Sequence, residues 1–425
     1  FMSFKDKSKV KDLSLADRGK EKIEWAKRWM IVLQKIGERF EKEKPFEGLK
    51  IGMALHLEKK TAVLVETLVK GGAEVTITSC NPLTTDDDVA AAVTDFATVY
   101  AWAGETTEEY YENLNRVIDT KPNIVIDDGA DLMFLLHTKR KKEAEHVIGG
   151  CEETTTGVIR LRNMERDGVL AFPVIAVNDA KMKHFFDNRY GTGQSSLEAI
   201  SRATNKLISG AKVVVAGYGW VGRGIARNFK GIGATVIVTE VDPIKALEAL
   251  YDGFIVTNMK DAIERYKPDF IITATGNCDV VRREHLEIMH DGVILANAGH
   301  FNVEVSVKDL EEYAISKRRI KECIDEYVLP GNRRAYLISE GRLVNLAQPC
   351  GQGHPIEVMD FSFAVQALSA EYIVKNKDKL ENKVYKVPLE IDEAIAKIKL
   401  ESMGVYIDEL TESQKKYLSE WQAGT

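Results

Sequence analysis

The sequence predicts an α/β protein made of two doubly wound parallel sheets, followed by a small C-terminal helical element. Short runs rich in Val and Ile alternate with helical patterns, and these runs fall into two series along the chain. The 425 residues are too many for one compact core, so two or three domains are expected. A charged helical pattern at about 388–421 closes the chain.

The first series predicts the sheet of an N-terminal domain. Its expected strands are 49–55, 73–80, 123–128 and 173–178. A helical pattern at 61–72 fills the first gap, as a parallel sheet requires between neighbouring strands. We expect this domain to span 1–180 and to be completed by 355–385, where the chain returns to it.

The second series predicts a separate sheet within 186–350. Its expected strands are 212–217, 235–240, 270–275 and 293–297. The two connections between the domains then fall near 178–190 and 347–357, and we expect both to act as hinges. Residues 386–425 form a third, C-terminal segment.

Composition excludes several classes of function. The 58 basic and 65 acidic residues give a net charge of −7, which argues against nucleic-acid and membrane-surface binding. No apolar run is long enough to span a bilayer, and no signal peptide is expected. The five cysteines are scattered at 80, 151, 278, 323 and 350, without a C-x-x-C or a histidine cluster. This spacing predicts reduced cysteines in a cytoplasmic protein and no metal site.

A glycine-rich turn marks the second domain. In VVVAGYGWVGRG, Gly217, Gly219 and Gly222 satisfy G-x-G-x-x-G between a strand and a helical pattern. Such glycines let the backbone approach a pyrophosphate at a helix N-terminus. Glu240 ends the next strand, where a carboxylate favours NAD over NADP. The sequence therefore predicts a Rossmann-like NAD site.

Polar clusters occur where other strands end. They are 55–62, 127–131, 152–157, 178–188, 297–301, 340–345 and 353–355. Singly, each has a structural explanation: His56 as a core histidine, 152–156 as a helix cap, Lys183 as a surface cation. Because open α/β sheets bind ligands outside the carboxyl ends of their strands, together they predict a ligand crevice.

Four of these motifs resemble those of the S-adenosylhomocysteine hydrolase (adenosylhomocysteinase) family. They are CEETTTG at 151–157, GYGWVGRG at 217–224, GHFNVE at 299–304 and EGRLVNL at 340–346, and the resemblance runs from about 15 to 421. It implies two Rossmann-like domains, one for substrate and one for tightly bound NAD, which close on a hinge. It also implies a homotetramer, a dimer of dimers, with the C-terminal segment as oligomerisation element.

The resemblance implies a cytoplasmic thioether hydrolase that acts on a small-molecule nucleoside thioether and recycles its NAD. Lys183 and Asp187 match the pair that binds and deprotonates the ribose 3′-hydroxyl. His56 and Asp128 match the acid/base residues near the 4′ and 5′ carbons. Two further catalytic residues are implied, Glu153 on the ribose hydroxyls and His300 beside homocysteine and nicotinamide.

The resemblance also implies binding contacts. Those to substrate are Leu55, Glu58, Lys60, Thr61, Gly353, His354, Met359 and Phe363. Those to NAD are Thr154, Thr155, Thr156, Asn188, Gly217, Gly219, Val221, Gly222, Glu240, Thr275, Asn277, Ala298, Gly299, His300 and Asn345.

The sequence departs from the family pattern at the base-reading positions. Glu58 and Lys60 stand where many members have Thr and Glu, the pair that reads adenine. Lys60 can only donate and an ionised Glu58 can only accept, which fits the 6-oxygen and the ring N–H of hypoxanthine. The sequence therefore favours S-inosylhomocysteine as the substrate. S-adenosylhomocysteine is the alternative, with Lys60 turned to solvent, or with a water or a backbone carbonyl of the loop before Ile356 reading adenine.

Other departures concern the loop at 347–355, which we call the gate loop, and the cofactor site. The gate loop, AQPCGQGHP, is two residues longer than usual and carries an unmatched Cys350. Lys245 replaces a cofactor-contacting asparagine, and Lys415, Lys416 and Tyr417 are equal candidates for closing the NAD site. Two remote alternatives are a plain NAD-dependent dehydrogenase and a non-catalytic relative.

Overall fold

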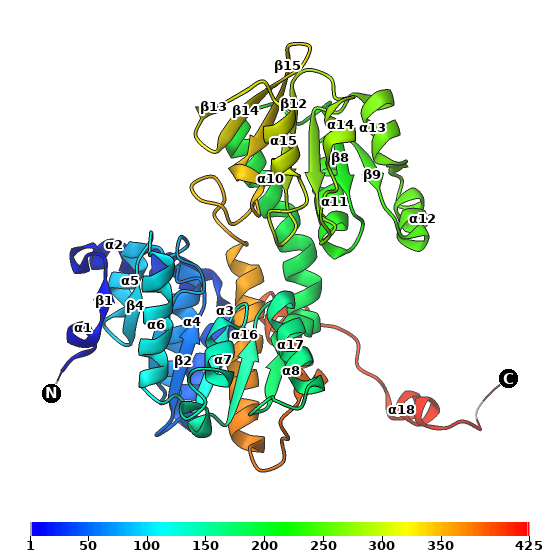
Figure 1. Ribbon diagram of the computed structural model, residues 1–425. Helices are drawn as coiled ribbons and strands as arrows, with labels where there is room; N and C mark the ends of the chain where they lie inside the picture. The colour runs from blue at the N-terminus through cyan, green and yellow to red at the C-terminus, as the bar shows by residue number, and fades with distance from the viewer. Residues whose placement is uncertain (1, 423, 425) are drawn as a thin grey trace.

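The computed structural model describes residues 2–422 and 424 and has two lobes, each built around an eight-stranded sheet (Figure 1). The first lobe holds the N-terminal part of the chain and helix α16, and the second holds the middle part. The C-terminal α17 and α18 follow the first lobe.

The sheet of the first lobe is parallel throughout, in the order β1-β4-β3-β2-β5-β6-β7-β16. Its strands are β1 Lys9–Val10, β2 Lys50–Ala54, β3 Glu74–Thr78, β4 Thr98–Ala101, β5 Ile124–Asp127, β6 Gly149–Glu152, β7 Val174–Ala176 and β16 Val384–Lys386. The helices of this lobe are α1 Phe4–Lys7, α2 Ala16–Trp29, α3 Ile31–Glu43, α4 Lys59–Lys70, α5 Asp87–Val93, α6 Thr107–Asp119, α7 Asp131–His137, α8 Thr155–Arg166 and α16 Ile356–Asn376, with short turns at η1 Leu13–Leu15 and η2 Glu143–His146.

Helix α16 is the central helix of the first lobe, although it follows the second lobe in sequence. It packs against α3, α4 and β6, and most of its side chains are buried. The Asp360 carboxylate accepts hydrogen bonds from the backbone N–H groups of Val32 and Leu33, both at 2.9 Å. Because Met30, the N-cap of α3, offers no side-chain cap, Asp360 satisfies these donors from another helix.

The second sheet is mixed, in the order β10-β9-β8-β11-β12-β15-β14-β13. Its elements are β8 Lys212–Ala216, β9 Thr235–Thr239, β10 Ile255–Val256, β11 Phe270–Thr273, β12 Val293–Asn297, β13 Ser316–Lys321, β14 Ile324–Leu329, β15 Arg333–Ile338, α10 Thr192–Thr204, α11 Trp220–Gly231, α12 Pro243–Tyr251, α13 Met259–Tyr266, α14 Arg283–Leu286, α15 Val307–Tyr313 and η5 Ser339–Gly341. The pairs β13–β14 and β14–β15 are antiparallel, which the prediction of a parallel sheet did not include. β13 is exposed along its length and rich in Lys and Arg, as an edge strand protected against further pairing is.

Two segments join the lobes. The first comprises η3 Val177–Asp179, α9 Lys181–Lys183 and η4 His184–Gly191, a π-helix that runs into α10. The second is the gate loop, which leads into α16. π-Helical turns often occur at functional sites, and η4 carries two of the predicted site residues, Asp187 and Asn188.

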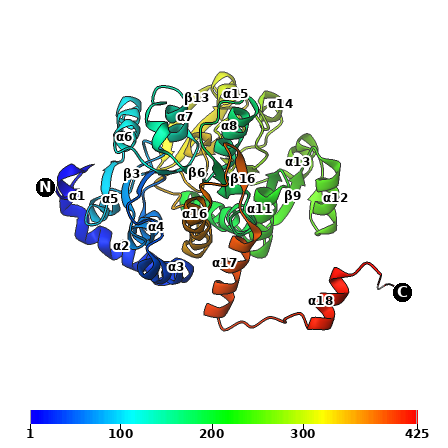
Figure 2. The ribbon, with the colours of Figure 1, turned by 90° about the horizontal axis from the view of Figure 1, so that it is seen from below.

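The C-terminal helical stretch is two helices rather than one. α17 Leu389–Ser402 lies against the first lobe, and α18 Glu412–Ser419 stands away from it (Figures 1 and 2). Gly404, with φ 68°, lies just beyond α17, and an extended segment follows. Every described residue from 401 onward is exposed.

The prediction of reduced cysteines is wrong for one pair, because the structure contains a disulfide between Cys323 and Cys350. It joins the turn between β13 and β14 to the gate loop across a sequence separation of 27. The spacing along the chain gave no sign of this contact, since only the antiparallel hairpin brings the turn to the gate loop. Both cysteines are buried.

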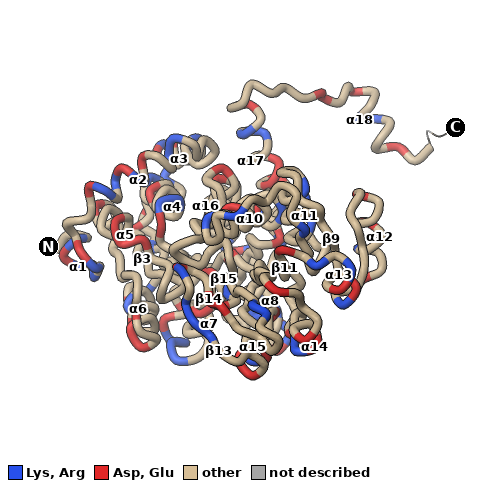
Figure 3. Tube along the Cα trace, turned by 90° about the horizontal axis from the view of Figure 1, so that it is seen from above, with Lys and Arg blue, Asp and Glu red and all other residues tan. Residues whose placement is uncertain are grey.

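Charged residues of both signs alternate over the helices of both lobes (Figure 3). This distribution agrees with the modest net charge of −7. Among the described residues, no helix combines the length and apolar character needed to cross a membrane.

Candidate active site

A cavity of about 1450 Å³ lies between the lobes. The carboxyl ends of strands from both sheets face it, as expected for ligand crevices of open α/β sheets. All but three of the predicted site residues line it, the exceptions being Gly217, Gly222 and Glu240.

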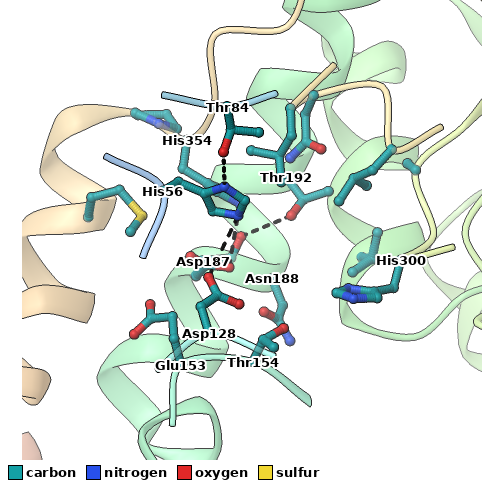
Figure 4. A pocket seen from close by; sticks show the side chains of 18 of the residues that line it. His56, Thr84, Asp128, Glu153, Thr154, Asp187, Asn188, Thr192, His300 and His354 are labelled. Carbon is teal, nitrogen blue, oxygen red and sulfur yellow. Dashed lines mark hydrogen bonds and ion pairs between the residues drawn. The ribbon is translucent and has the colours of Figure 1, made fainter. Parts of the chain in front are cut away.

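His56 and Asp128 approach each other because their strands are neighbours. β2 pairs with β5 in parallel, with Ala54 opposite Asp127, so the residues just beyond both strands meet. His56 Nε2 lies 3.7 Å from Asp128 Oδ2, and His56 Nδ1 forms a 2.7 Å hydrogen bond with Thr84 Oγ1 (Figure 4). Thr84, which the sequence analysis did not single out, therefore fixes the ring so that Nε2 faces the carboxylate.

Two buried carboxyl groups brace the loops that carry the site, and the sequence analysis missed both. Asp127 accepts from the backbone N–H groups of Asp128 and Met133, both at 2.9 Å. Glu152 accepts from those of Gly129 and Thr154, at 2.9 and 3.0 Å. Burial raises the pKa of Asp127 to about 7, and burial together with Asp127 and Asp128 raises that of Glu152 well above its usual value.

Glu153 is held by two side chains of α16. Ser362 donates a short hydrogen bond to one carboxyl oxygen of Glu153, and Gln366 Nε2 donates to the other at 2.6 Å. Burial raises the pKa of Glu153 to about 8, although the neighbouring Lys183 lowers it in part. Without a ligand, Glu153 is therefore mostly protonated at neutral pH.

Lys183 is surrounded by polar side chains in the first segment that joins the lobes. Its ammonium donates to Asn178 Oδ1 at 2.9 Å and Asn188 Oδ1 at 3.1 Å, and lies 3.4 Å from Asp187 Oδ1. His354 Nε2 approaches the same Asp187 oxygen at 3.7 Å. Burial alone would raise the pKa of Asp187, but His354 and Lys183 outweigh it and the pKa lies below its usual value.

His300 reaches the cavity from the second lobe (Figure 4). Its Nε2 lies 3.3 Å from Thr156 Oγ1 of the first lobe, so one hydrogen bond spans the two lobes at the cavity. Burial lowers the pKa of His300, partly offset by Asp128. A neutral imidazole is the result at neutral pH.

The predicted base-reading residues stand at the start of α4. The Glu58 carboxylate caps this helix by accepting from the N–H groups of Lys60 and Thr61. Lys60 is only 4% exposed, and its ammonium donates to the backbone oxygen of His354 at 2.7 Å and lies 3.6 Å from Glu58 Oε2. The lysine is thus directed at the gate loop and the cavity, not at solvent.

The glycine-rich turn forms an open cradle. A Cβ at Gly222 would lie 1.9 Å from the Gly217 carbonyl oxygen, so only glycine fits this close approach. At Gly219, the N-cap of α11, a Cβ would meet nothing within 4 Å, and no side chain caps the helix. The first amides of α11 are therefore free for an anionic group such as a pyrophosphate.

Two further predicted cofactor contacts, Glu240 and Asn345, are oriented by hydrogen bonds. The Glu240 carboxylate accepts from the N–H groups of Tyr218, Val241 and Asp242, which orients it beside the glycine turn. Asn345 donates to Ser195 Oγ, while its own side-chain oxygen is buried without a hydrogen-bond partner among the described residues. An amide-bearing ligand in the cavity would satisfy that oxygen.

Two family profiles match the chain. The profile for the S-adenosyl-L-homocysteine hydrolase NAD-binding domain matches residues 188–351, and that for S-adenosyl-L-homocysteine hydrolase matches 7–148. The chain is 61% identical over 417 residues to a protein of Methanocaldococcus jannaschii named S-inosyl-L-homocysteine hydrolase, covering 98% of this chain and 99% of that protein. It is 59% identical over 418 residues to a protein of Aquifex aeolicus named adenosylhomocysteinase, with coverage of 98% and 99%. The chain thus contains an NAD-binding domain and belongs to the S-adenosyl-L-homocysteine hydrolase family.

Proposed function

We propose that the protein hydrolyses S-inosyl-L-homocysteine to inosine and L-homocysteine, with NAD that is held and recycled. The observation that carries the choice of base is the buried Lys60 ammonium in the cavity beside Glu58. Overall similarity does not decide between the bases, because relatives named for either substrate are about equally identical to this chain.

The site residues fit the reaction of the family. The glycine turn and Asn345 would hold NAD, which would supply a reversible hydride acceptor for the 3′ carbon of the ribose. Lys183, with Asp187 beside it, binds the 3′-hydroxyl and, in its neutral amine form, accepts the hydroxyl proton. The resulting ketone makes the 4′ proton acidic, so that the pair His56 and Asp128 can remove it and serve the departing homocysteine and the entering water.

Hydrogen-bond complementarity favours hypoxanthine over adenine. The Lys60 ammonium has three donors and uses one on the His354 carbonyl, which leaves two for the 6-oxygen of hypoxanthine. Glu58 uses its carboxylate on two backbone amides but keeps lone pairs for the ring N–H. Adenine would instead present its 6-amino donors to the ammonium, and a buried mismatch of this kind is costly.

The test compares kcat/KM for S-inosylhomocysteine and S-adenosylhomocysteine on the same preparation. We expect a preference of about 10²-fold or more for the inosyl substrate. An equal or higher value for the adenosyl substrate would overturn the assignment of the base. One observation favours this alternative, namely the hydrogen bond from Lys60 to the His354 carbonyl. If that bond is the whole role of Lys60, the lysine holds the gate loop and does not contact the base.

We propose that the lobes act as two domains, with 1–180 and 355–385 binding substrate and 186–350 binding NAD. Hinges near 178–190 and 347–357 would open the cavity for substrate and close it around the reactive ketone. The π-helix η4 and the gate loop lie in these two segments. Small-angle scattering of a sample first shown to be open, with and without a nucleoside inhibitor, tests this closure.

We further propose a homotetramer, a dimer of dimers, in which 386–425 contacts another subunit. The described part of this segment exposes large apolar side chains, among them Tyr406 at 87% and Trp421 at 90%. A second exposed apolar face lies on α12 and just before it, from Val241 to Tyr251. Exposed apolar surfaces of this kind mark interfaces, and α12 follows the cofactor-side Glu240 directly. Light scattering of the full chain and of a chain ending at residue 402 tests the proposal.

We propose a cytoplasmic location from the metabolic role of the family. The disulfide between Cys323 and Cys350 is a feature that counts against a strongly reducing surrounding. Both cysteines are buried, at 5% and 8% exposure, so reductants reach them poorly. Trapping of free thiols in fresh cell extract would show whether the bridge exists there.

A further inference from the structure

One cluster beside the acid/base pair has the composition of a metal site. Ligand atoms of His56, Cys80 and Asp128 all lie within 4.8 Å of one another, the one such group among the described residues. We propose that these three side chains bind a divalent transition-metal ion that accepts thiolate, Zn²⁺ above all, and that the ion inhibits the enzyme. The inhibition rests on the proposed role of His56 and Asp128, whereas binding of the ion does not.

The topology of the sheet brings the three residues together. β3, β2 and β5 are neighbours in this order and run parallel. Ala54 lies opposite Thr78 on one side and Asp127 on the other. The three strands therefore end side by side, at the same level in the sheet. His56 and Cys80 each lie two residues beyond the end of their strand, and Asp128 lies one residue beyond the end of its own. All three side chains are therefore placed at the same edge of the sheet.

The spacing is close to that of a tetrahedral zinc site. Ligand atoms at the usual Zn²⁺ distances stand about 3.4–3.8 Å apart. His56 Nε2 and Asp128 Oδ2 are already 3.7 Å apart, so they can share an ion without rearrangement. Cys80 Sγ lies within 4.8 Å of a ring nitrogen of His56 and a carboxylate oxygen of Asp128, so an approach of at most about 1 Å completes the three-ligand set.

The surroundings orient and attract such an ion. Thr84 binds His56 Nδ1, and when Nδ1 donates this hydrogen bond, Nε2 carries the free lone pair that a metal needs. Burial raises the pKa of the Cys80 thiol, and the nearby Asp128, Asp127 and Glu152 raise it further. The Asp128 carboxylate attracts a cation, which in turn would displace the thiol proton.

An ion bound there would block the reaction. It would take the Nε2 lone pair of His56 and an oxygen of Asp128, the two groups proposed to exchange protons with the substrate. With three protein ligands, the fourth position of a tetrahedral ion is left to water or to a ligand in the cavity.

The decisive variant is Cys80→Ser, because Cys80 has no part in the proposed reaction. We expect this variant to turn over within about threefold of the wild type, and its half-inhibitory Zn²⁺ concentration to rise by about 10- to 100-fold. Cys278→Ser, which removes an exposed thiol, is the matched control and should leave Zn²⁺ inhibition unchanged. Equal Zn²⁺ sensitivity of the wild type and Cys80→Ser would overturn the proposal.

A second measurement does not depend on activity or on the folding of the variant. Co²⁺ added to the NAD-loaded wild type should give a thiolate-to-cobalt charge-transfer band with one ion per subunit, and Zn²⁺ should displace it. The band should be absent from Cys80→Ser and present in Cys278→Ser. Absence of the band from the wild type would refute the site even if the proposed hydrolase activity stands.

Discussion

The two lobes line the same cavity with different kinds of chemical group. The first lobe and the connecting segment present buried ionisable side chains, such as Asp127, Glu153 and Lys183, and each of them is hydrogen-bonded to other groups of the protein. The second lobe presents a glycine turn with free amides and open space at Gly219. The difference agrees with the proposal that the first side exchanges protons with the substrate, whereas the second holds an anionic cofactor through fixed backbone groups.

The largest expected effect comes from the side that handles protons. We expect Lys183→Met to lower kcat by at least about 10³-fold, because the proposed proton acceptor for the 3′-hydroxyl is lost. Bound NAD should remain, since the glycine turn is in the other lobe. The measurement is turnover together with the NAD content of the gel-filtered protein.

Lys181→Met is the matched control for Lys183→Met. Lys181 lies in the same short helix but is exposed, so this variant should keep near-normal turnover. Normal 3′-oxidation in Lys183→Met would remove Lys183 from its proposed role, and loss of NAD would show that the two sides are not separable.

On the cofactor side, the expected effect is loss of NAD. We expect Gly222→Ala to weaken NAD binding by about 10²-fold, because the new Cβ would clash with the Gly217 carbonyl and distort the cradle. Gly231→Ala, at the other end of α11, is the control because a Cβ there meets nothing within 4 Å. Stoichiometric NAD in Gly222→Ala would contradict the assignment of the cradle.

The same contrast explains what the sequence could predict. The glycine cradle is contiguous in sequence, and its spacing alone indicates a strand, a turn and a helix. The contacts of Glu153 with Ser362 and Gln366 join residues more than 200 positions apart, so no local pattern reveals them. The group of His56, Cys80 and Asp128 was hidden for the same reason, since three separate strand ends supply it.

Four strands of the first sheet, β1, β4, β6 and β16, were also missed, and β6 was missed for a local reason. β6 reads Gly-Gly-Cys-Glu and has no apolar run, yet all four residues are buried. A Cβ at Gly149 would lie 2.6 Å from the Ile373 side chain of α16. The strand therefore has no side chain at the point where the central helix packs against it. Hydrophobic patterning detects strands that bring their own apolar side chains, and β6 is covered by those of its neighbours.

A smaller effect, on the preference between the two substrates, is expected from Glu58 and Lys60 beside the gate loop. In Glu58→Thr combined with Lys60→Glu, the adenine-reading pair of the family replaces the present one. We expect the preference for the inosyl over the adenosyl substrate to fall by about 10²-fold, measured as the ratio of the two kcat/KM values. Lys42→Glu, the same lysine-to-glutamate change at an exposed position, should leave the ratio unchanged. An unchanged ratio in the double variant would show that another group reads the base.

The last expected effect is on stability rather than on activity, and it concerns the pH dependence of stability on the proton-handling side. The pKa of Glu153 is about 8 in the folded protein against 4.5 for an ordinary glutamate. The folded state therefore keeps a proton that the unfolded state has lost, and Glu153 makes the fold progressively less stable as pH rises from about 4.5 to 8. Glu153→Gln mimics the protonated form, can still bond Ser362 and Gln366, and does not titrate.

We therefore expect the substrate-free Glu153→Gln variant to match the wild type in Tm near pH 5 and to exceed it at pH 9, by an amount equivalent to a few kcal/mol. Calorimetry or denaturant unfolding at several pH values gives the measurement, with Glu112→Gln on the exposed face of α6 as the control. No such gain is expected from the cofactor side, where the cradle consists of backbone amides that do not titrate in this range. A Tm difference that stays constant between pH 5 and pH 9 would mean that Glu153 is ionised in the folded protein. The substrate side would then hold a buried negative charge beside Lys183, and the contrast between the two sides would rest on geometry alone.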